Sequence, residues 1–365
     1  MTASHLQVFR IVSASRTIVF NVVLGMLLCS CSRAANTDQP PAEGSSTAPA
    51  LAMTEAPVES LVASDNGATV IAALPMESGA SPVTAASAAS TGKLPVLMVH
   101  LVTDTDALYT ITKARFRHTL ALLYAHGYRP ITVAQMIDRR IDVAPGMRPV
   151  VFTFDDASAS QFGYIEKNGS LQIDPESAVG IWLAFARTHP DWKPRATFCM
   201  LSGAEAGRSF FGNKGIEGQK TEWRFRKLQF LRDQGFELCN HTLWHANLAK
   251  YPDAFVQEQI ARGQLAIDSA VPGYKVRTFA LPLGVWPKNR ALAQRGQWRD
   301  PKTGVVTRYN HDAILEVAGG PSVNPFDPSF NPLRIRRFNL HHDAVDSLVA
   351  RLERTNTGYV MPPSR

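Results

Sequence analysis

The chain has 365 residues, of which 45% are hydrophobic and 19% charged, with four cysteines and a formal net charge of +7. This composition excludes a wholly disordered chain, and four cysteines are too few for a small fold held together by disulfides. Residues 93–365 carry a net charge of +10, which suits anionic polymers or lipid headgroups. No basic cluster is interleaved with aromatic residues, so nucleic-acid binding is not expected.

The first thirty residues are predicted to be an export signal. The apolar run Ile18–Leu28 is short for a membrane span and typical of a signal-peptide core. It leads into Leu28-Cys29-Ser30-Cys31, which resembles a bacterial lipobox and predicts lipid attachment at Cys31. An ordinary secretory peptide cut after Ala34, or a short membrane anchor, is the alternative. Because Ser32 rather than Asp follows Cys31, resemblance to the bacterial sorting rule favours the outer membrane, or a periplasm-facing position in the cell envelope.

A segment rich in Ala, Ser, Thr and Pro follows the export signal up to residue 92. Such a segment cannot bury enough apolar surface to offset the entropy lost on ordering, so we expect a disordered tether. The sequence therefore divides into a lipoprotein signal peptide (1–30), a tether (31–92) and a catalytic domain (93–365).

From Lys93 onward, continuous apolar runs alternate with amphipathic segments. The apolar runs predict strands over Leu94–His100, Pro149–Phe154, Ala196–Met200, Phe236–Cys239, Val276–Leu281, Ala313–Val317 and Leu333–Phe338. The helical spacing of apolar residues predicts helices over Lys113–His126, Glu176–Thr188, Glu222–Gln234 and Asp253–Ala270. This alternation implies an α/β fold in which helices cover a parallel sheet, as a barrel or a doubly wound sheet. The functional site should then lie at the carboxyl ends of the strands.

Polar motifs follow two of the predicted strands. Thr153-Phe154-Asp155-Asp156 ends one strand, and two adjacent carboxylates repel unless a cation is near, although a turn or helix cap is the simpler interpretation. His241 and His245 follow another strand, and four-residue spacing puts two imidazoles on one side of a helical turn, as a divalent metal requires. One carboxylate and two imidazoles together are typical of a hydrolytic metal site with open positions.

In chain order, Thr-Phe-Asp-Asp, His-Thr-x-x-His and Ala-x-Pro-x-Gly resemble the polysaccharide deacetylase family, carbohydrate esterase family 4 with its NodB-type domain. Leu97-Met-Val-His100 and Gly127-Tyr-Arg-Pro-Ile-Thr132 resemble its poly-N-acetylglucosamine deacetylase branch. The resemblance implies a distorted (β/α) barrel and a metal-dependent hydrolase of acetyl groups. It implies Asp155 as the catalytic base. It also implies a divalent metal, zinc before cobalt, nickel or manganese, held by Asp156, His241 and His245.

The resemblance implies the remaining site residues less directly. Pro282 and Gly284 match the third motif, but Phe279-Ala280 stands where Phe-Arg is usual, so the motif's arginine is missing. The segment Asn331–Phe338 resembles a strand of the same branch that ends in an arginine. If Ile335 faces the barrel interior, the two-residue period of a strand places Arg337 there too, as a catalytic residue. The expected proton donor is a histidine. His341 is the first choice, with His342, His311 and His100 as alternatives, and His100 is otherwise expected to contact substrate.

The sequence thus predicts an exported, lipid-anchored deacetylase of an N-acetylated polysaccharide. An O-acetyl esterase acting on a glycan and a non-catalytic glycan-binding lipoprotein are the alternatives. Cys199 and Cys239 lie on neighbouring predicted strands and are expected to be buried free thiols, because parallel neighbours rarely offer good bridge geometry. The glycan and the oligomeric state do not follow from the sequence.

Overall fold

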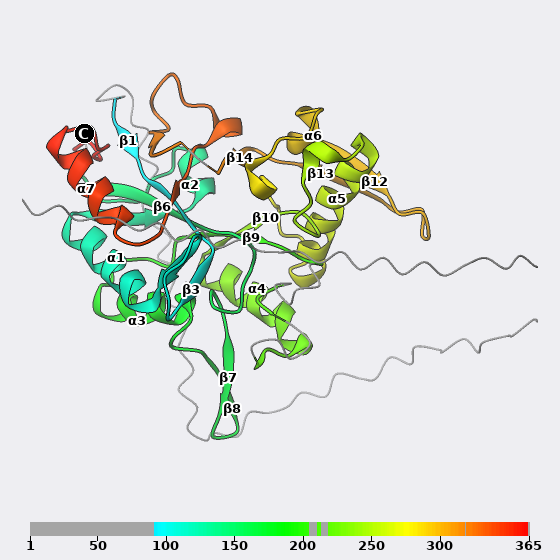
Figure 1. The fold of residues 1–365 in the computed structure, drawn as a ribbon, viewed down its shortest axis with the longest axis horizontal. Helices are drawn as coiled ribbons and strands as arrows, with labels where there is room; N and C mark the ends of the chain where they lie inside the picture. Colours follow the sequence, from blue (N-terminus) through cyan, green and yellow to red (C-terminus); the bar gives the residue numbers. More distant parts are fainter. Residues whose placement is uncertain (1–90, 204–209, 213–217, 318, 364–365) are drawn as a thin grey trace, which may run out of the picture. The chain divides into compact units, whose positions relative to one another are not determined.

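The structure, a computed structural model, describes residues 91–203, 210–212, 218–317 and 319–363 (Figure 1). The predicted signal peptide, Cys31 and nearly all of the predicted tether lie outside the described residues. Within the described ranges, the helices are too short or too polar to cross a bilayer.

A parallel eight-stranded sheet forms the centre of the fold. Its main path runs in the order β14-β11-β10-β9-β6-β2-β16, and β5 pairs with the first half of β6. The strands of this sheet are β2 (Val96–Val99), β5 (Tyr128–Ile131), β6 (Arg148–Phe154), β9 (Thr197–Met200), β10 (Glu237–Asn240), β11 (Thr278–Ala280), β14 (Ala313–Leu315) and β16 (Phe338–Asn339). The predicted parallel sheet is therefore confirmed.

The two edges of this sheet curve toward each other. Leu315 in β14 makes a single parallel bridge to Ile335, which lies just before β16 at the other edge. This closure gives the expected distorted barrel. The predicted strand Leu333–Phe338 is wrong, because Pro332–Arg334 form a short 3-10 turn and regular pairing begins only at Phe338.

Helices cover the outside of the sheet. They are α1 (Lys113–Ala125), α2 (Val133–Ile137), α3 (Ala178–Thr188), α4 (Arg224–Gln234), α5 (Asp253–Ala270), α6 (Ala291–Gln294) and α7 (Ala344–Arg354). Helix α1 packs between α3 and α7, and α4 packs on α5 (Figure 1). The four predicted helices are confirmed, α5 at both ends. Gly235 ends α4 in the left-handed conformation, with φ of +91°.

Side chains of β6 alternate between two apolar layers. Phe152 and Phe154 belong to the core between the sheet and its helices, whereas Val151 belongs to the cluster inside the barrel. The interior cluster also contains Cys199, Cys239, Ala280, Leu315 and Ile335. The two-residue period of the strand therefore aims Asp155, directly after β6, into the barrel.

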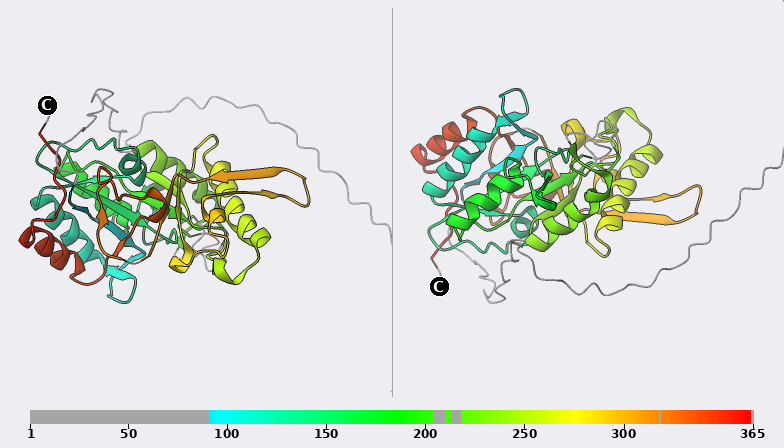
Figure 2. Two further views of the ribbon diagram at one scale, coloured as in Figure 1. Left: turned by 90° about the horizontal axis from the view of Figure 1, so that it is seen from above. Right: turned by 90° about the horizontal axis from the view of Figure 1, so that it is seen from below.

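Further strand pairs lie outside this sheet. An arm formed by β12 (Arg295–Arg299) and β13 (Val306–Asn310) projects from the domain, orange in Figure 2, and packs on α5. The other strands are β1 (Lys93–Leu94), β3 (Leu101–Thr103), β4 (Thr110–Thr112), β7 (Tyr164–Lys167), β8 (Ser170–Ile173) and β15 (Ser322–Val323). None of these strand pairs is predicted from the sequence.

The cysteine prediction is wrong, since Cys199 and Cys239 form a disulfide. The residues are directly opposite each other on β9 and β10, and their Cα atoms are 4.2 Å apart. Neighbouring strands in this register bring the two sulfurs together inside the barrel, two residues before His241. The sequence predicts that the two strands are neighbours but does not predict their register. The disulfide forms because the register places Cys199 opposite Cys239.

We expect the disulfide to stabilise the domain. It closes a sequence separation of 40 residues, for which chain entropy predicts about 4 kcal/mol. The Cys199→Ala/Cys239→Ala variant should lose about this much free energy of unfolding in a denaturant titration. Mass spectrometry of unreduced peptides should find the two cysteines linked. An unlinked pair, together with equal unfolding midpoints for variant and wild type, would contradict the assignment.

Candidate active site

A cavity of about 350 Å³ opens where β2, β6, β10 and β11 end. Residues that follow β2, β6 and β10 supply its charged and imidazole groups, and the lining residues that follow β11 are apolar. The cavity is lined by His100, Leu101, Leu108, Tyr109, Asp155, Asp156, His241, His245, Leu281, Leu283 and Val317. The predicted location at the carboxyl ends of the strands is therefore confirmed.

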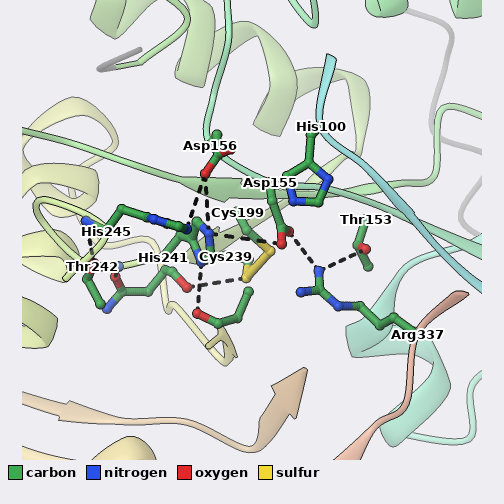
Figure 3. A network of polar contacts seen from close by, with 12 residues as sticks. His100, Thr153, Asp155, Asp156, Cys199, Cys239, His241, Thr242, His245 and Arg337 are labelled. Carbon is green, nitrogen blue, oxygen red and sulfur yellow. Dashed lines mark hydrogen bonds and ion pairs between the residues drawn. A yellow bond between two sulfur atoms is a disulfide. The ribbon is translucent and has the colours of Figure 1, made fainter. Parts of the chain in front are cut away.

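The two carboxylates after β6 point in different directions (Figure 3). Asp155 continues the strand, since its backbone N–H donates to the carbonyl of Val99 at 2.9 Å. Asp156 has φ of +74° and Ala157 has φ of +49°, so the chain turns sharply in the left-handed region. Left-handed backbone is costly for residues with a side chain and is concentrated at functional sites. This turn separates the two carboxyl groups, with Asp155 facing Arg337 and Asp156 facing the histidines.

His241 and His245 converge on Asp156 from the loop after β10. The predicted helical turn is wrong, because this loop is irregular and Thr242 and His245 have φ of +70° and +59°. The Thr242 hydroxyl accepts from the backbone N–H of His245 at 3.1 Å, and the Asn240 side chain accepts from that of Thr242 at 2.9 Å. Side-chain hydrogen bonds and left-handed residues in the loop therefore bring the two imidazoles together.

Asp156, His241 and His245 form a donor set that fits a divalent metal. Their ligand atoms all lie within 4.8 Å of one another. Asp156 Oδ1 is 3.5 Å from His241 Nε2 and 3.6 Å from His245 Nε2. Oδ1 of Asp156 and Nε2 of His241 are buried and lack a hydrogen-bond partner, and buried polar atoms of this kind normally have one.

The surroundings prepare both imidazoles for a cation. His241 Nδ1 lies 2.9 Å from the Ala280 carbonyl, so a proton on Nδ1 donates there and Nε2 is the nitrogen left for a metal. Burial alone would lower the pKa of His241, but the carboxylates of Asp155 and Asp156 outweigh it and raise the pKa, so a cation would displace a proton from Nε2. Burial lowers the pKa of His245 to about 4, which keeps this imidazole neutral near neutral pH. Neutral imidazoles and an ionised carboxylate are the forms that bind a metal.

Asp155 is paired with Arg337 inside the barrel. The Arg337 guanidinium donates to Asp155 Oδ1 at 2.7 Å and to the Thr153 hydroxyl at 3.2 Å, and both partners of the ion pair are buried. Its Nε donates to the Glu316 carbonyl at 2.9 Å. Burial alone would raise the pKa of Asp155, but the charges of Arg337 and His241 outweigh it and hold the pKa well below its usual range. The structure thus brings the arginine proposed from the strand period to the predicted base.

His100 is the remaining histidine of the cavity. Its Nδ1 is buried without a hydrogen-bond partner, and its ring lies against that of Tyr109 with centroids 4.8 Å apart. Burial lowers its pKa, and the carboxylates of Asp155 and Asp156 oppose this shift. The buried Gln161 amide donates to the carbonyls of both His100 and Asp155, so it joins the ends of β2 and β6.

The other candidate proton donors are not among the residues that line the cavity. His341 stands against His342 in the turn before α7, and His342 pairs with Asp106 at 3.5 Å. His311 is fully buried and stacks on Phe279. The resemblance of Leu340-His341-His342-Asp343 to the family's Leu-His-Asp motif favours His341, whereas the position of β2 beside β6 favours His100.

Pro282 and Gly284 shape the loop after β11. They form a short 3-10 turn in which the neighbouring Leu281 and Leu283, not Pro282 or Gly284, line the cavity. Gly284 has φ of +66°, and a Cβ added there would lie 2.7 Å from Val317 Cβ. Pro282 and Gly284 therefore contribute to the site by setting the backbone shape of the loop that carries Leu281 and Leu283. The apolar lining residues are not predicted from the sequence. Leu281 and Leu283 neighbour motif residues, whereas Leu108, Tyr109 and Val317 have no signal in the sequence.

Comparison with known proteins finds similarity to polysaccharide deacetylases. The sequence model described as polysaccharide deacetylase matches residues 186–296, a range that contains His241 and His245 but not Asp155, Asp156 or Arg337. No curated protein matches the chain. The Streptococcus pyogenes deacetylase PplD, solved with acetate, superposes with a TM-score of 0.50 at 13% identity, covering 74% of this chain and 99% of PplD.

Two further solved structures have lower scores. The polysaccharide deacetylase BC0361 from Bacillus cereus has a TM-score of 0.49 at 19% identity, covering 71% of this chain and 69% of its own. IcaB from Ammonifex degensii has a TM-score of 0.48 at 17% identity, covering 71% of this chain and 96% of its own. The chain is thus similar to polysaccharide deacetylases in sequence over residues 186–296, and similar in fold to the deacetylase PplD over 74% of its length.

Proposed function

We propose that this chain is a metal-dependent deacetylase that removes acetyl groups from an N-acetylated polysaccharide at the cell envelope, with zinc as the metal. One observation carries the proposal. A three-donor cluster, a carboxylate fixed by an arginine and an imidazole with an unpaired buried nitrogen line a single cavity. Hydrolysis of an acetamide needs these three functions together: electrophilic activation, a base for water and a proton donor for the amine.

Asp156, His241 and His245 would hold the cation. A divalent ion bound there acts as a Lewis acid toward the acetyl carbonyl and lowers the pKa of a nearby water. Asp155 accepts the proton of the attacking water. Arg337 occupies Oδ1 of Asp155, so Oδ2, which lies 4.0 Å from His241 Nε2, is the oxygen left for this proton. The guanidinium thus keeps the carboxylate both ionised and oriented.

His100 supplies the proton for the leaving amine. The C–N bond breaks as the nitrogen takes this proton, and the products are acetate and a free amino sugar. The ring lies at the end of β2, beside the strand that presents Asp155, so donor and base stand on neighbouring strand ends. The unpaired Nδ1 of His100 is the atom assigned to this transfer.

Exchange of single histidines tests this role. His100→Gln should lower the rate of acetate release by roughly 10²–10⁴-fold, the usual contribution of a general acid, while bound metal stays near one equivalent. His341→Gln is the matched control and should keep wild-type turnover, since its side chain is not part of the cavity lining. Acetate release and metal content are measured on the same preparations.

If His341→Gln lost turnover and His100→Gln did not, the proton donor would be His341 and the assignment of His100 would be wrong. The substrates should include N-acetylated and O-acetylated glycans side by side. Release from O-acetyl esters alone would replace the deacetylase proposal with an esterase. Binding of glycans without any acetate release would make the domain a non-catalytic glycan-binding module.

We also propose that the domain is attached to the membrane through a lipid on Cys31. The support is the lipobox-like Leu28-Cys29-Ser30-Cys31 after a short apolar run. Wild-type protein should fractionate with membranes, and mass spectrometry should find an acylated Cys31 at the mature amino terminus. Cys31→Ser should remain unprocessed or leave the membrane fraction. If the wild-type protein is unacylated and washes free of membranes, the proposed lipid anchor is wrong.

A further inference from the structure

A second cavity, of about 330 Å³, lies at the seam where the two edges of the barrel sheet meet. The described residues that line it are all different from those that line the catalytic cavity. Its charged and hydroxyl-bearing lining residues are Lys93, Glu316, Ser322, Ser329, Arg334 and Arg336. We call this space the seam cavity. Its volume is within the range of small-ligand sites in proteins.

A single layer of backbone separates the seam cavity from the catalytic site. Glu316 lines the seam cavity, and the next residue, Val317, lines the catalytic cavity. Arg336 lines the seam cavity, and the next residue, Arg337, points to Asp155 inside the barrel (Figure 3). Successive side chains of an extended segment point to opposite sides, so these neighbours mark the two faces of one wall. A ligand in the seam cavity would therefore contact the segment that holds Arg337.

Two of the three cations of the seam cavity lack a carboxylate partner. Arg334 forms an ion pair with Glu316 at 3.0 Å, and the same carboxylate oxygen accepts from the Trp286 indole at 3.1 Å. Lys93 and Arg336 are exposed, and within the described part of the chain neither forms an ion pair. Like charges that line one cavity repel each other unless an anion lies between them. The unpaired cations therefore point to an anionic ligand.

The charge of the lining fits a dianion. Three cations and one carboxylate give it a formal net charge of +2. Asp327, whose pKa is lowered by hydrogen bonds from Ser329 and by the charge of Lys93, does not line the cavity. A phosphate monoester carries about −1.5 to −2 at neutral pH, whereas a carboxylate carries about −1. Arginine binds phosphate through paired N–H donors, and lysine binds it as a point charge.

We propose that the seam cavity is a binding site for a phosphate monoester, with the phosphoryl group held by Lys93, Arg334 and Arg336. The hydroxyls of Ser322 and Ser329 line the same space and suit a hydroxylated body attached to the phosphate. This site does not depend on the proposed deacetylase activity. Inorganic phosphate and small phosphate esters share the chemistry that the cavity recognises, and the probes below distinguish these sources.

Calorimetric titration of the wild-type protein provides the test. The probes are inorganic phosphate, glycerol 3-phosphate and glucose 6-phosphate. The tightest of them should bind saturably and raise Tm, because a ligand of the folded state stabilises it. Arg336→Gln and Lys93→Gln, on different segments, should each weaken that binding about tenfold, since each removes a charged donor. Arg308→Gln is the matched control, because Arg308 is also exposed but does not line the cavity.

The relative affinity of the probes identifies the source. Tighter binding of an ester than of inorganic phosphate supports a site with room for the hydroxylated body, and tighter binding of inorganic phosphate supports a site for the free ion. Glucuronate, which carries a carboxylate on a similar sugar, should bind more weakly than glucose 6-phosphate. If glucuronate bound more tightly, the site would recognise carboxylates and the phosphate assignment would be wrong.

Three further results would overturn the site. The first is that none of the phosphate probes binds saturably to the wild-type protein. The second is an equal loss of binding in Arg336→Gln and Arg308→Gln, which would reduce the effect to general attraction by a basic surface. The third is loss of binding in Asp156→Asn with none in Arg336→Gln, which would place the phosphate at the metal donors of the catalytic cavity.

Discussion

The buried ion pair between Arg337 and Asp155 sets the geometry of the whole site. Two charges with no solvent exposure are costly to bury, and removing one partner of such a pair typically costs about 3–5 kcal/mol. The pair therefore ties the segment before β16 to the end of β6, and the same segment closes the barrel through the bridge between Leu315 and Ile335. It also fixes one oxygen of Asp155, so that the adjacent Asp156 is free to face the histidines.

The site is built at the expense of backbone strain. Asp156, Thr242 and His245 all have left-handed backbone, each at a cost of order 1–3 kcal/mol. Two of the three are the proposed metal ligands, and the third orients His245 by a hydrogen bond. A bound cation would compensate this strain, since Oδ1 of Asp156 and Nε2 of His241, which it would draw together, are buried without a hydrogen-bond partner. The Cys199–Cys239 bridge below His241 adds a covalent constraint between the neighbouring strands.

The parallel sheet and the pair of histidines can be predicted from local sequence patterns. The place of His100 in the site and the disulfide depend on which strands are neighbours. Continuous apolar runs predict the parallel sheet, and the bounds of α5 are predicted at both ends. The histidine pair is found by its spacing, although the assumed helical turn is wrong. The position of His100 beside Asp155 depends on the strand order, and the disulfide depends on the register of β9 and β10. Hydrophobic periodicity predicts neither the order nor the register. Tyr109 gave no signal, because a lone exposed tyrosine in a loop is ordinary in sequence.

The division of labour between Asp155 and Asp156 is the central claim, and exchanging each carboxylate for its amide tests it most directly. Asp155→Asn keeps an oxygen for Arg337 but cannot take a proton from water, so it should retain the metal while acetate release falls by roughly 10²–10⁴-fold. Asp156→Asn removes one of three protein ligands and should lose metal and turnover together. Metal content and acetate release measured on the same samples would contradict this account if Asp155→Asn lost the metal and Asp156→Asn kept it.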